Sequence, residues 1–189
     1  LRNITGAIRT IKEINLLGGA CGVLFPAARL GEKECSASGI DTPIRIARIQ
    51  RFLVEHASRI GFKPLEAPAS RGKGADKARV AVVGGGPAGL SCGAELAKAG
   101  VAVTVFEARP EPGGAMRYGV PAFRLSREFL KSEVSDVQAL GVEIKCSSPI
   151  TGRGAAEKLL KQGFHAVFLC PGLWGETRLK AGPRPSKGL

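Results

Sequence analysis

The chain has 189 residues, of which 44% are apolar, and a formal net charge of +12. This length allows one sizeable domain plus a smaller one, with roughly 70% of the unfolded surface buried on folding. No run of residues approaches the ~18 consecutive apolar residues of a membrane-spanning helix. Because the sequence moves directly from Leu1 into amphipathic residues without a secretory signal, we expect a cytoplasmic protein, and the missing initiator Met suggests a trimmed or partial product.

The positive charge would attract an acidic partner protein, a polyphosphate ligand or nucleic acid. The basic residues are scattered along the chain, and the single Tyr and single Trp provide little aromatic interleaving. This pattern disfavours a nucleic-acid-binding module. The five cysteines form no Cys-x-x-Cys pair, which argues against a disulfide framework.

Apolar residues recur at helical spacing between Ile4 and Ile14, which predicts an amphipathic helix. Asn3 or Thr5 is available as its N-cap, and Gly18-Gly19 is expected to stop it. Residues 20–41 show no periodicity and indicate a long loop, which a compact domain usually keeps for a functional reason.

A second helix is predicted from Thr42-Pro43 to Gly61, because Pro is favoured at the first helical position. Residues 63–77 are rich in Pro, Ala, Ser, Gly and Lys and are interpreted as a linker. The predicted core stripe of the helix consists of Ile46, Ile49, Phe52, Leu53, Ala57 and Ile60.

Residues 84–89, Gly-Gly-Gly-Pro-Ala-Gly, follow an apolar run and open a helical pattern that ends at Ala99. Gly84 lets the strand end in a sharp turn, and Gly86 lets the backbone approach a pyrophosphate. Gly89 lets the helix pack close to the strand. The order of strand, glycine turn and helix therefore predicts a nucleotide-binding βαβ unit, with the diphosphate at the helix N-terminus.

A second apolar run, residues 101–106, ends in Glu107, which lies 18 residues after Gly89. An acidic residue about 20 residues beyond the turn is placed to accept hydrogen bonds from an adenosine ribose. The alternative is a solvated Glu at a strand end and a glycine turn that serves packing only.

The rest of the chain continues the alternation of strands and helices, after a long loop over residues 108–125 that is rich in Gly, Pro and Arg. The fold class is therefore α/β, with an open, mostly parallel Rossmann-like sheet preceded by a small all-α domain. The predicted elements are a helix capped by Ser126 and ending at Leu140, a strand over 142–146, a helix over 154–162 and a buried strand over 165–169.

Several motifs resemble the small (beta) subunit of NADPH-dependent glutamate synthase and, equally, the flavin half of dihydropyrimidine dehydrogenase. The resemblance extends across nearly the whole chain. It is carried by Val82-Val-Gly-Gly-Gly-Pro-Ala-Gly-Leu90, Val105-Phe-Glu-Ala-Arg-Pro-Glu-Pro-Gly-Gly114, Arg117-Tyr-Gly-Val-Pro-Ala-Phe-Arg-Leu125, Leu140-Gly-Val-Glu-Ile144 and the N-terminal Gly6-Ala-Ile-Arg-Thr-Ile-Lys-Glu-Ile-Asn15.

The resemblance implies that the bound nucleotide is FAD. It assigns the ribose to Glu107, the adenine side to a backbone contact at Ile150, and the diphosphate charge to Arg124, whose guanidinium suits it better than an ammonium. The remaining cofactor-binding residues that it implies are Gly84, Gly86, Pro87, Ala88, Gly89, Gly113, Gly114, Ala115 and Gly172.

In the family, a hydride passes from NADPH to FAD, and electrons then leave through [4Fe–4S] clusters to a partner such as the glutamate synthase large subunit. The corresponding cysteine run begins at Cys21 and ends at Cys35, but Phe25 and Gly31 occupy two of its four cysteine positions. Two thiolates do not hold a four-iron cluster. We therefore interpret Cys21 and Cys35 as remnants and do not expect a cluster in this chain alone.

The resemblance also implies an organisation into an N-terminal helical domain of the Fe–S type over residues 1–62, the linker over 63–77 and an FAD/NAD(P)-binding domain over 78–189. The family's NADPH-binding insertion would begin near the end of this chain, so NADPH is expected only in a complete parent protein. No catalytic residue is predicted, because the reactivity belongs to the cofactor. The alternative function is a non-catalytic interaction module, or truncated homologue, that keeps the fold.

Overall fold

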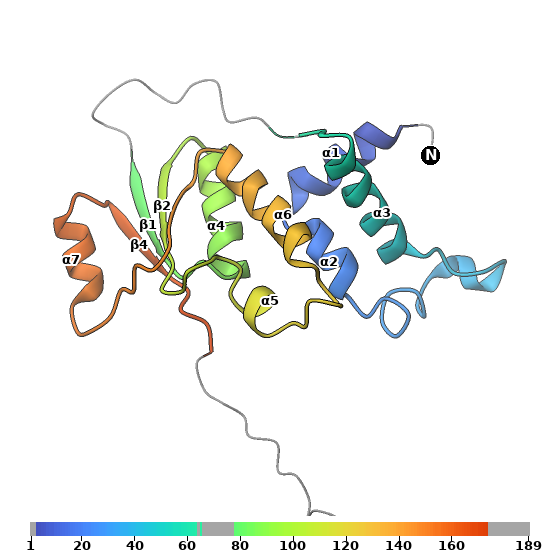
Figure 1. Ribbon diagram of the computed structural model, residues 1–189. Helices are drawn as coiled ribbons and strands as arrows, with labels where there is room; N and C mark the ends of the chain where they lie inside the picture. Colours follow the sequence, from blue (N-terminus) through green and yellow to red (C-terminus); the bar gives the residue numbers. More distant parts are fainter. Residues whose placement is uncertain (1–2, 64, 66–77, 174–189) are drawn as a thin grey trace, which may run out of the picture.

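The computed structural model describes residues 3–63, 65 and 78–173. Its elements form two groups that pack against each other: helices of the N-terminal third, and a parallel sheet with its own helices (Figure 1). The N-terminal group consists of α1 (Ile4–Ile14), α2 (Gly18–Leu24), the short 3₁₀ helix η1 (Ser36–Gly39) and α3 (Ile46–Arg59). The sheet group consists of β1 (Arg79–Val83), α4 (Pro87–Lys98), β2 (Ala102–Phe106), α5 (Ala115–Tyr118), α6 (Arg127–Ala139), β3 (Glu143–Lys145), α7 (Ala155–Lys161) and β4 (Ala166–Leu169).

The four strands form one parallel sheet in the order β3-β2-β1-β4. Val82 in the middle of β1 pairs with Val105 of β2 on one side and with Phe168 of β4 on the other. Parallel strands need crossover connections, which α4, α6 and α7 provide. The predicted open parallel α/β sheet is therefore confirmed.

Helices cover both faces of the sheet, as Figure 1 shows. On one face, α4 and α6 contribute Leu90, Leu130 and Val137 to the main core, all fully buried with Val82 and Val105. On the other face, α7 closes a smaller core of Ala81, Leu159 and Phe164. Burial of apolar side chains on both faces explains why β1 and β2 read as near-continuous apolar runs in the sequence.

The N-terminal helices contact the sheet group through α2, which lies between α3 and α6. The buried Glu133 carboxylate on α6 accepts hydrogen bonds from the N–H groups of Gly19 and Ala20 at 2.9 Å each, in the first turn of α2. It also accepts one from the buried Lys12 ammonium at 2.9 Å, and that ammonium pairs with Asp136 at 3.0 Å. An acid at a helix N-terminus complements the helix dipole, so this contact fixes α2 against the sheet group.

The structure corrects the predicted loop over residues 20–41, because Gly18-Gly19 begins α2. The two glycines do not stop α1, which already ends at Ile14 with Asn15 as its C-cap. Asn3 caps α1 as predicted, through a 2.8 Å hydrogen bond from the Gly6 N–H. The prediction missed α2 because its start is stabilised by Glu133, more than a hundred residues away. Glycine also allows the close approach, since a Cβ at Gly19 would lie 2.6 Å from the Phe129 ring.

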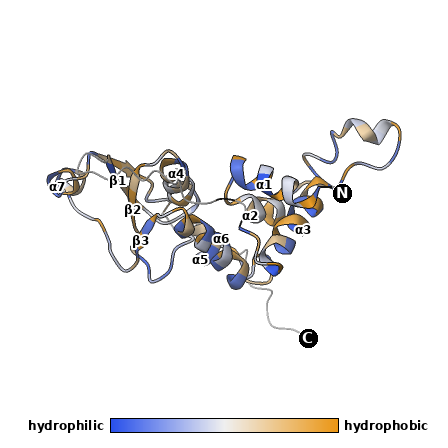
Figure 2. Cartoon of the chain, turned by 90° about the horizontal axis from the view of Figure 1, so that it is seen from above, coloured by the Kyte–Doolittle hydropathy of each residue, from blue (hydrophilic) through white to orange (hydrophobic). Residues whose placement is uncertain are grey.

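The second helix starts later than predicted, at Ile46 rather than at Thr42-Pro43. Its predicted core stripe is only partly correct. Leu53 and Ala57 are buried together with Val54, whereas the other predicted members, Ile46, Ile49, Phe52 and Ile60, are between 40% and 53% exposed. Their exposure gives the helix a second, apolar surface. In Figure 2 parts of the α3 ribbon are orange, the colour of hydrophobic residues.

The last strand, β4, is less buried than predicted, because its residues are mostly exposed at the edge of the sheet. Phe168 is 41% and Leu169 is 60% exposed. The interpretation of residues 63–77 as a linker falls almost entirely on residues outside the described part of the chain. Within the described residues, none of the helices is long and apolar enough to cross a membrane.

Candidate functional site

The glycine turn at the carboxyl end of β1 brings strand and helix into direct backbone contact. Gly84 has a φ of +115°, and a Cβ there would lie 2.2 Å from the Cys170 carbonyl oxygen. A Cβ at Gly89 would lie 1.9 Å from the Gly84 carbonyl oxygen. Both distances are shorter than any real Cβ contact, so β1, α4 and the end of β4 can meet only because these positions carry no side chain.

The first turn of α4 faces the crevice beyond the strand ends. Gly86 is its N-cap and Pro87 its first residue. The first intrahelical hydrogen bond runs from Leu90 N–H to the Gly86 carbonyl at 2.9 Å, so the N–H groups of Ala88 and Gly89 precede the helical ladder. Such N–H groups and the positive end of the helix dipole favour an anion.

Glu107, at the carboxyl end of β2, is 6% exposed and lies directly against the glycine turn. Its Oε2 accepts a hydrogen bond from the Gly85 N–H at 2.7 Å, and its Oε1 accepts one from the Arg109 N–H at 2.8 Å. A carboxylate has about four lone-pair sites, so each oxygen retains the capacity to accept one further hydrogen bond. Glu107 is therefore not a solvated acid at a strand end, which was the alternative interpretation of the sequence.

The loop over residues 113–115 packs onto the same turn. The Gly113 N–H donates to the Gly85 carbonyl at 2.7 Å, and a Cβ at Gly114 would lie 2.7 Å from the Gly86 Cα. Ala115 begins the short helix α5, which the sequence did not predict. Thus the structure gathers residues 84–89, Glu107 and residues 113–115 at the carboxyl edge of β1 and β2. In open α/β sheets, ligands bind at this edge.

Side-chain contacts close the loop between β2 and α5. Arg117 Nε donates to Glu111 Oε2 at 2.8 Å, and this hydrogen bond lowers the pKa of the Glu111 carboxyl. Tyr118 Oη donates to the Glu111 carbonyl at 3.1 Å, and the Arg109 guanidinium lies over the Tyr118 ring at 4.3 Å. An ion pair and an aromatic ring therefore link the residues on either side of Gly113 and Gly114.

The Cys170 thiol lies beneath the glycine turn, close to the carbonyl oxygens of Val83 (3.2 Å) and Gly84 (3.4 Å). Burial raises the pKa of Cys170 to about 11, and the nearby Cys92 and Glu107 add to the shift. The thiol therefore stays protonated near neutral pH and donates to backbone carbonyls, in a packing role.

Three predicted site residues lie outside this cluster. Arg124 is exposed on the loop before α6, where it lines a groove together with residues of α2 and α3. Ile150 is half-buried against the smaller core that α7 closes. Gly172 is exposed two residues after Cys170, with a φ of +76°.

A four-iron cluster does not fit the donors in the described residues. Cys21 is exposed on α2, where it accepts a hydrogen bond from Asn15 Nδ2 at 3.2 Å, and Cys35 is half-buried next to η1. Nowhere in the described ranges do three or more His, Cys, Asp or Glu side chains gather in a way that could hold a metal ion. Such a cluster takes four thiolates.

Sequence reasoning missed Gly85 and the buried pair formed by Lys12 and Glu133. A Cβ at Gly85 would lie 2.8 Å from Glu107 Oε2, so the third glycine of the run allows the Glu107 contact. The sequence could have indicated Gly85, because the run of three glycines has one more than the nucleotide-binding motif requires. The sequence does not reveal the pair of Lys12 and Glu133, because the two residues lie on different helices, 121 positions apart in the chain.

These features define a class of protein: a Rossmann-like nucleotide-binding α/β unit joined to a helical N-terminal part. The family described as "NAD(P)-binding Rossmann-like domain" matches residues 82–128. The family described as "Dihydroprymidine dehydrogenase domain II, 4Fe-4S cluster" matches residues 1–61. The second match names a cluster, in contrast to the donors described above.

Curated relatives agree with these matches. The NAD-dependent dihydropyrimidine dehydrogenase subunit PreT of Salmonella typhimurium is 38% identical over 172 residues, which are 91% of this chain and 40% of that protein. The glutamate synthase [NADPH] small chain of Escherichia coli is 32% identical over 88% of this chain and 34% of that protein. The solved 6-hydroxypseudooxynicotine amine oxidase of Pseudomonas geniculata N1 is 26% identical and covers 64% of this chain and 17% of that chain, with a TM-score of 0.43.

The chain is thus similar to the glutamate synthase small chain and to the dihydropyrimidine dehydrogenase subunit PreT. The resemblance noted in the sequence is thereby confirmed, and the relatives are NAD(P)-dependent oxidoreductase subunits. The chain spans about two fifths of the length of the PreT relatives and about a third of the glutamate synthase small chain.

Proposed function

We propose that this chain is the FAD-binding portion of an NAD(P)H-dependent oxidoreductase subunit. The main support is the cluster at the carboxyl edge of β1 and β2, where the glycine turn, the α4 N-terminus and the Glu107 carboxylate meet. A diphosphate needs the glycine turn and the helix N-terminus, and a ribose needs a hydrogen-bond acceptor such as the Glu107 carboxylate. The names of the relatives, which specify NAD or NADPH and oxidoreductase subunits, support the reaction class.

Gly86 provides an independent argument for a ligand at the turn. A Cβ at Gly86 would make only an ordinary contact with the Gly114 Cα, at 3.7 Å. Its φ of −80° is also open to any residue. The fold itself therefore does not require glycine at this position, in contrast to Gly84 and Gly89, whereas a pyrophosphate against the backbone would.

In this proposal, residues 84–89 hold the diphosphate with backbone N–H groups, and Glu107 orients the adenosine ribose through its remaining lone pairs. The small residues Gly113, Gly114 and Ala115 let their own loop pass close to the flavin end of the cofactor. FAD would supply the hydride-accepting chemistry, and the protein binds and orients it. Arg124, Ile150 and Gly172 are assigned to the same cofactor by resemblance alone.

Electrons would leave FAD toward a partner oxidoreductase subunit, comparable to the glutamate synthase large subunit. We propose that residues 1–62 form the helical part, 63–77 the linker and 78–189 the incomplete nucleotide domain, with NADPH bound elsewhere in a complete parent protein. We do not route electrons through a cluster on Cys21 and Cys35, because two thiolates do not hold four irons. All five cysteines are free, which supports a reducing compartment such as the cytoplasm.

The test is the visible absorption spectrum of the purified chain, with its released chromophore identified, for the native protein and for Gly86→Ala. We expect FAD in the native chain and loss of FAD in Gly86→Ala. The loss of stability should be limited to about 1 kcal/mol, the typical difference between glycine and alanine at an N-cap. Gly93→Ala, on the same helix, is the matched control and should retain FAD. A native chain that is colourless and gains no thermal stability from added FAD would contradict the proposal.

The alternative is a non-catalytic interaction module. The exposed apolar side chains of Ile46, Ile49 and Phe52 on α3 favour it, because a surface of this kind suits a protein partner. A colourless protein that binds no FAD would support this alternative.

A further inference from the structure

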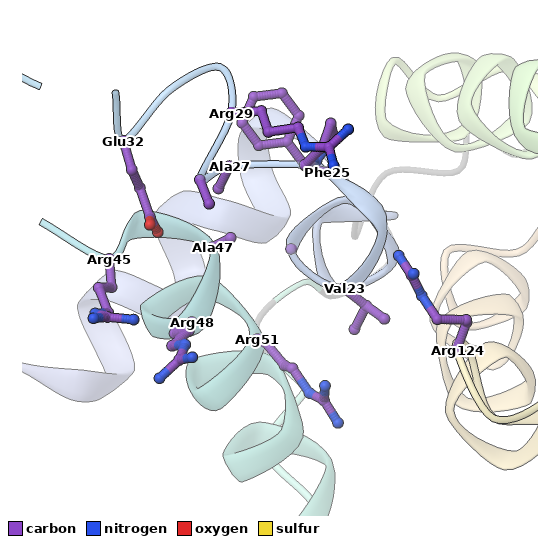
Figure 3. A pocket seen from close by; sticks show the side chains of 13 residues that line it. Val23, Phe25, Ala27, Arg29, Glu32, Arg45, Ala47, Arg48, Arg51 and Arg124 are labelled. Atoms are coloured by element: carbon purple, nitrogen blue, oxygen red, sulfur yellow. The ribbon is translucent and has the colours of Figure 1, made fainter. Parts of the chain in front are cut away.

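A groove of about 610 Å³ opens between α2, the turn that follows it, α3 and the loop before α6. Figure 3 shows arginine side chains reaching it from these separate segments. Arg29 comes from the turn after α2, and Arg45, Arg48 and Arg51 come from the start and middle of α3. Arg124 approaches from the opposite side. Five of the 28 basic residues that are scattered in the sequence are thus brought together here by the fold.

The charge of the groove is strongly unbalanced. Five arginines and one acidic residue, Glu32, line it. Arg51 is paired with Glu55 outside the groove, with Nε and Oε1 2.6 Å apart. Within the described ranges, no ion pair is formed by Arg29, Arg45, Arg48 or Arg124. Several guanidinium groups are therefore available to an anion that enters the groove.

The lining points to phosphate groups on an organic ligand. All of the cationic residues are arginines, whose planar guanidinium binds phosphate through two parallel hydrogen bonds. The groove volume is within the range of about 300–1,000 Å³ of small-molecule sites. Small residues between the arginines, such as Ala28 and Ala47, leave space for the ligand.

An apolar wall adjoins the arginines. Phe25 and Val23 line the groove, and the Phe25 ring is half-exposed. The Phe25 ring packs close to Gly31, where a Cβ would lie 3.3 Å from the ring. An exposed ring beside guanidinium groups can stack on a base or another flat group, as in nucleotide sites.

We propose that this groove binds an organic polyphosphate, such as a nucleoside di- or triphosphate, at a site separate from the glycine turn. Its phosphates contact the arginines of α3 and of the flanking loops, and its organic part lies against Phe25. None of the lining residues belongs to residues 84–89, and Arg124 is the one lining residue that the resemblance also assigns to the flavin. The proposal therefore does not depend on FAD being bound at the turn.

The test is calorimetric titration of the 189-residue chain with ATP, ADP, AMP and inorganic tripolyphosphate at low salt. We expect saturable binding at one site, with an affinity that decreases from ATP to ADP to AMP. ATP should bind more tightly than tripolyphosphate because of the Phe25 contact. Arg45→Ala combined with Arg48→Ala should weaken ATP binding by tenfold or more, because each arginine makes charge-assisted hydrogen bonds. Both residues are exposed, so we expect this variant to fold.

The matched control is Arg59→Ala combined with Arg153→Ala. It removes the same charge, with Arg59 on the same helix, but from exposed positions that do not line the groove. This control should bind ATP as the native chain does. Absence of saturable binding, an equal loss in the control, or tighter binding of a polyglutamate peptide than of ATP would overturn the proposal. A parallel loss of FAD in the Arg45/Arg48 variant would also overturn it, because the groove would then belong to the flavin site.

Discussion

The Glu107 carboxylate holds the backbone of Gly85, with Oε2 2.7 Å from the amide nitrogen. This hydrogen bond joins the end of β2 to the glycine turn after β1. It makes Glu107 both a structural residue and the proposed ribose ligand. The two roles can be separated, because the structural role affects the stability of the FAD-free protein, whereas the ribose contact affects only the binding of FAD.

Replacement of Glu107 by alanine should reduce both stability and FAD binding. The Gly85 N–H is buried and would lose its acceptor, which costs about 1–3 kcal/mol. The free energy of unfolding is measured by urea denaturation of the FAD-free protein, and Glu13→Ala, an exposed acid on α1, should change it by less than about 0.5 kcal/mol. Unchanged stability would show that the Gly85 contact contributes nothing.

Gly89→Ala and Gly93→Ala, both on α4, should have opposite effects on stability. A Cβ at Gly89 would lie 1.9 Å from the Gly84 carbonyl oxygen, whereas a Cβ at Gly93 would meet valine methyl groups at 3.4–3.6 Å. We expect Gly89→Ala to destabilise by about 3 kcal/mol or to prevent folding. Gly93→Ala should be neutral or stabilise by up to about 1 kcal/mol, since alanine favours a helix. Thermal unfolding of both variants measures the difference, and equal melting temperatures would contradict this account of the turn.

Removal of the Glu133 carboxylate should destabilise the contact between the N-terminal helices and the sheet group. Glu133→Ala leaves the buried Lys12 ammonium without one of its two acidic partners and removes the acceptor for Gly19 and Ala20. Breaking a buried pair costs about 3–5 kcal/mol. Glu128→Ala, an exposed change in the first turn of the same helix, should cost no more than about 1 kcal/mol. Hydrogen exchange of α2 distinguishes local release from global unfolding, and unaltered exchange would refute the proposed fixing of α2.

Arg124→Ala tests whether this residue serves the flavin, as the resemblance implies. We expect weaker FAD retention by about tenfold, because a charge-assisted hydrogen bond to the diphosphate would be lost. The FAD content per chain is measured after dialysis, with Arg48→Ala as the control that changes only the arginine groove. An unchanged FAD content would remove Arg124 from the flavin site and leave it to the groove that it lines.

Cys170 should react with an alkylating reagent more slowly than the exposed Cys21. Burial raises the pKa of Cys170 to about 11, so the folded state holds its proton more tightly than the unfolded chain does. The corresponding stabilisation is fully present below about pH 9 and is lost as the pH rises toward 11. Mass spectrometry after iodoacetamide treatment at pH 8 should show alkylation of the exposed Cys21 well before Cys170. Equal rates would show that Cys170 is accessible as a thiolate.

The sequence by itself determined the parallel sheet and the position of its glycine turn. Residues 84–89, Glu107 and the Ser126 cap act through neighbours in the chain or through a fixed strand–turn–helix order, so local patterns reveal them. The resemblance to the glutamate synthase small subunit followed from the same motifs. These features depend on backbone geometry and on interactions between residues close in sequence, which a single sequence records directly.

Only the tertiary structure decided the features that join distant residues. Helix α2 begins where Glu133 accepts its first N–H groups, α3 buries Leu53 but exposes Ile49, and arginines from three segments meet in one groove. In each case the stabilising or charged partner comes from another element, and no periodicity records such a partner. Exposure and charge density are properties of packed surfaces, and these arise only when the helices and the sheet come together.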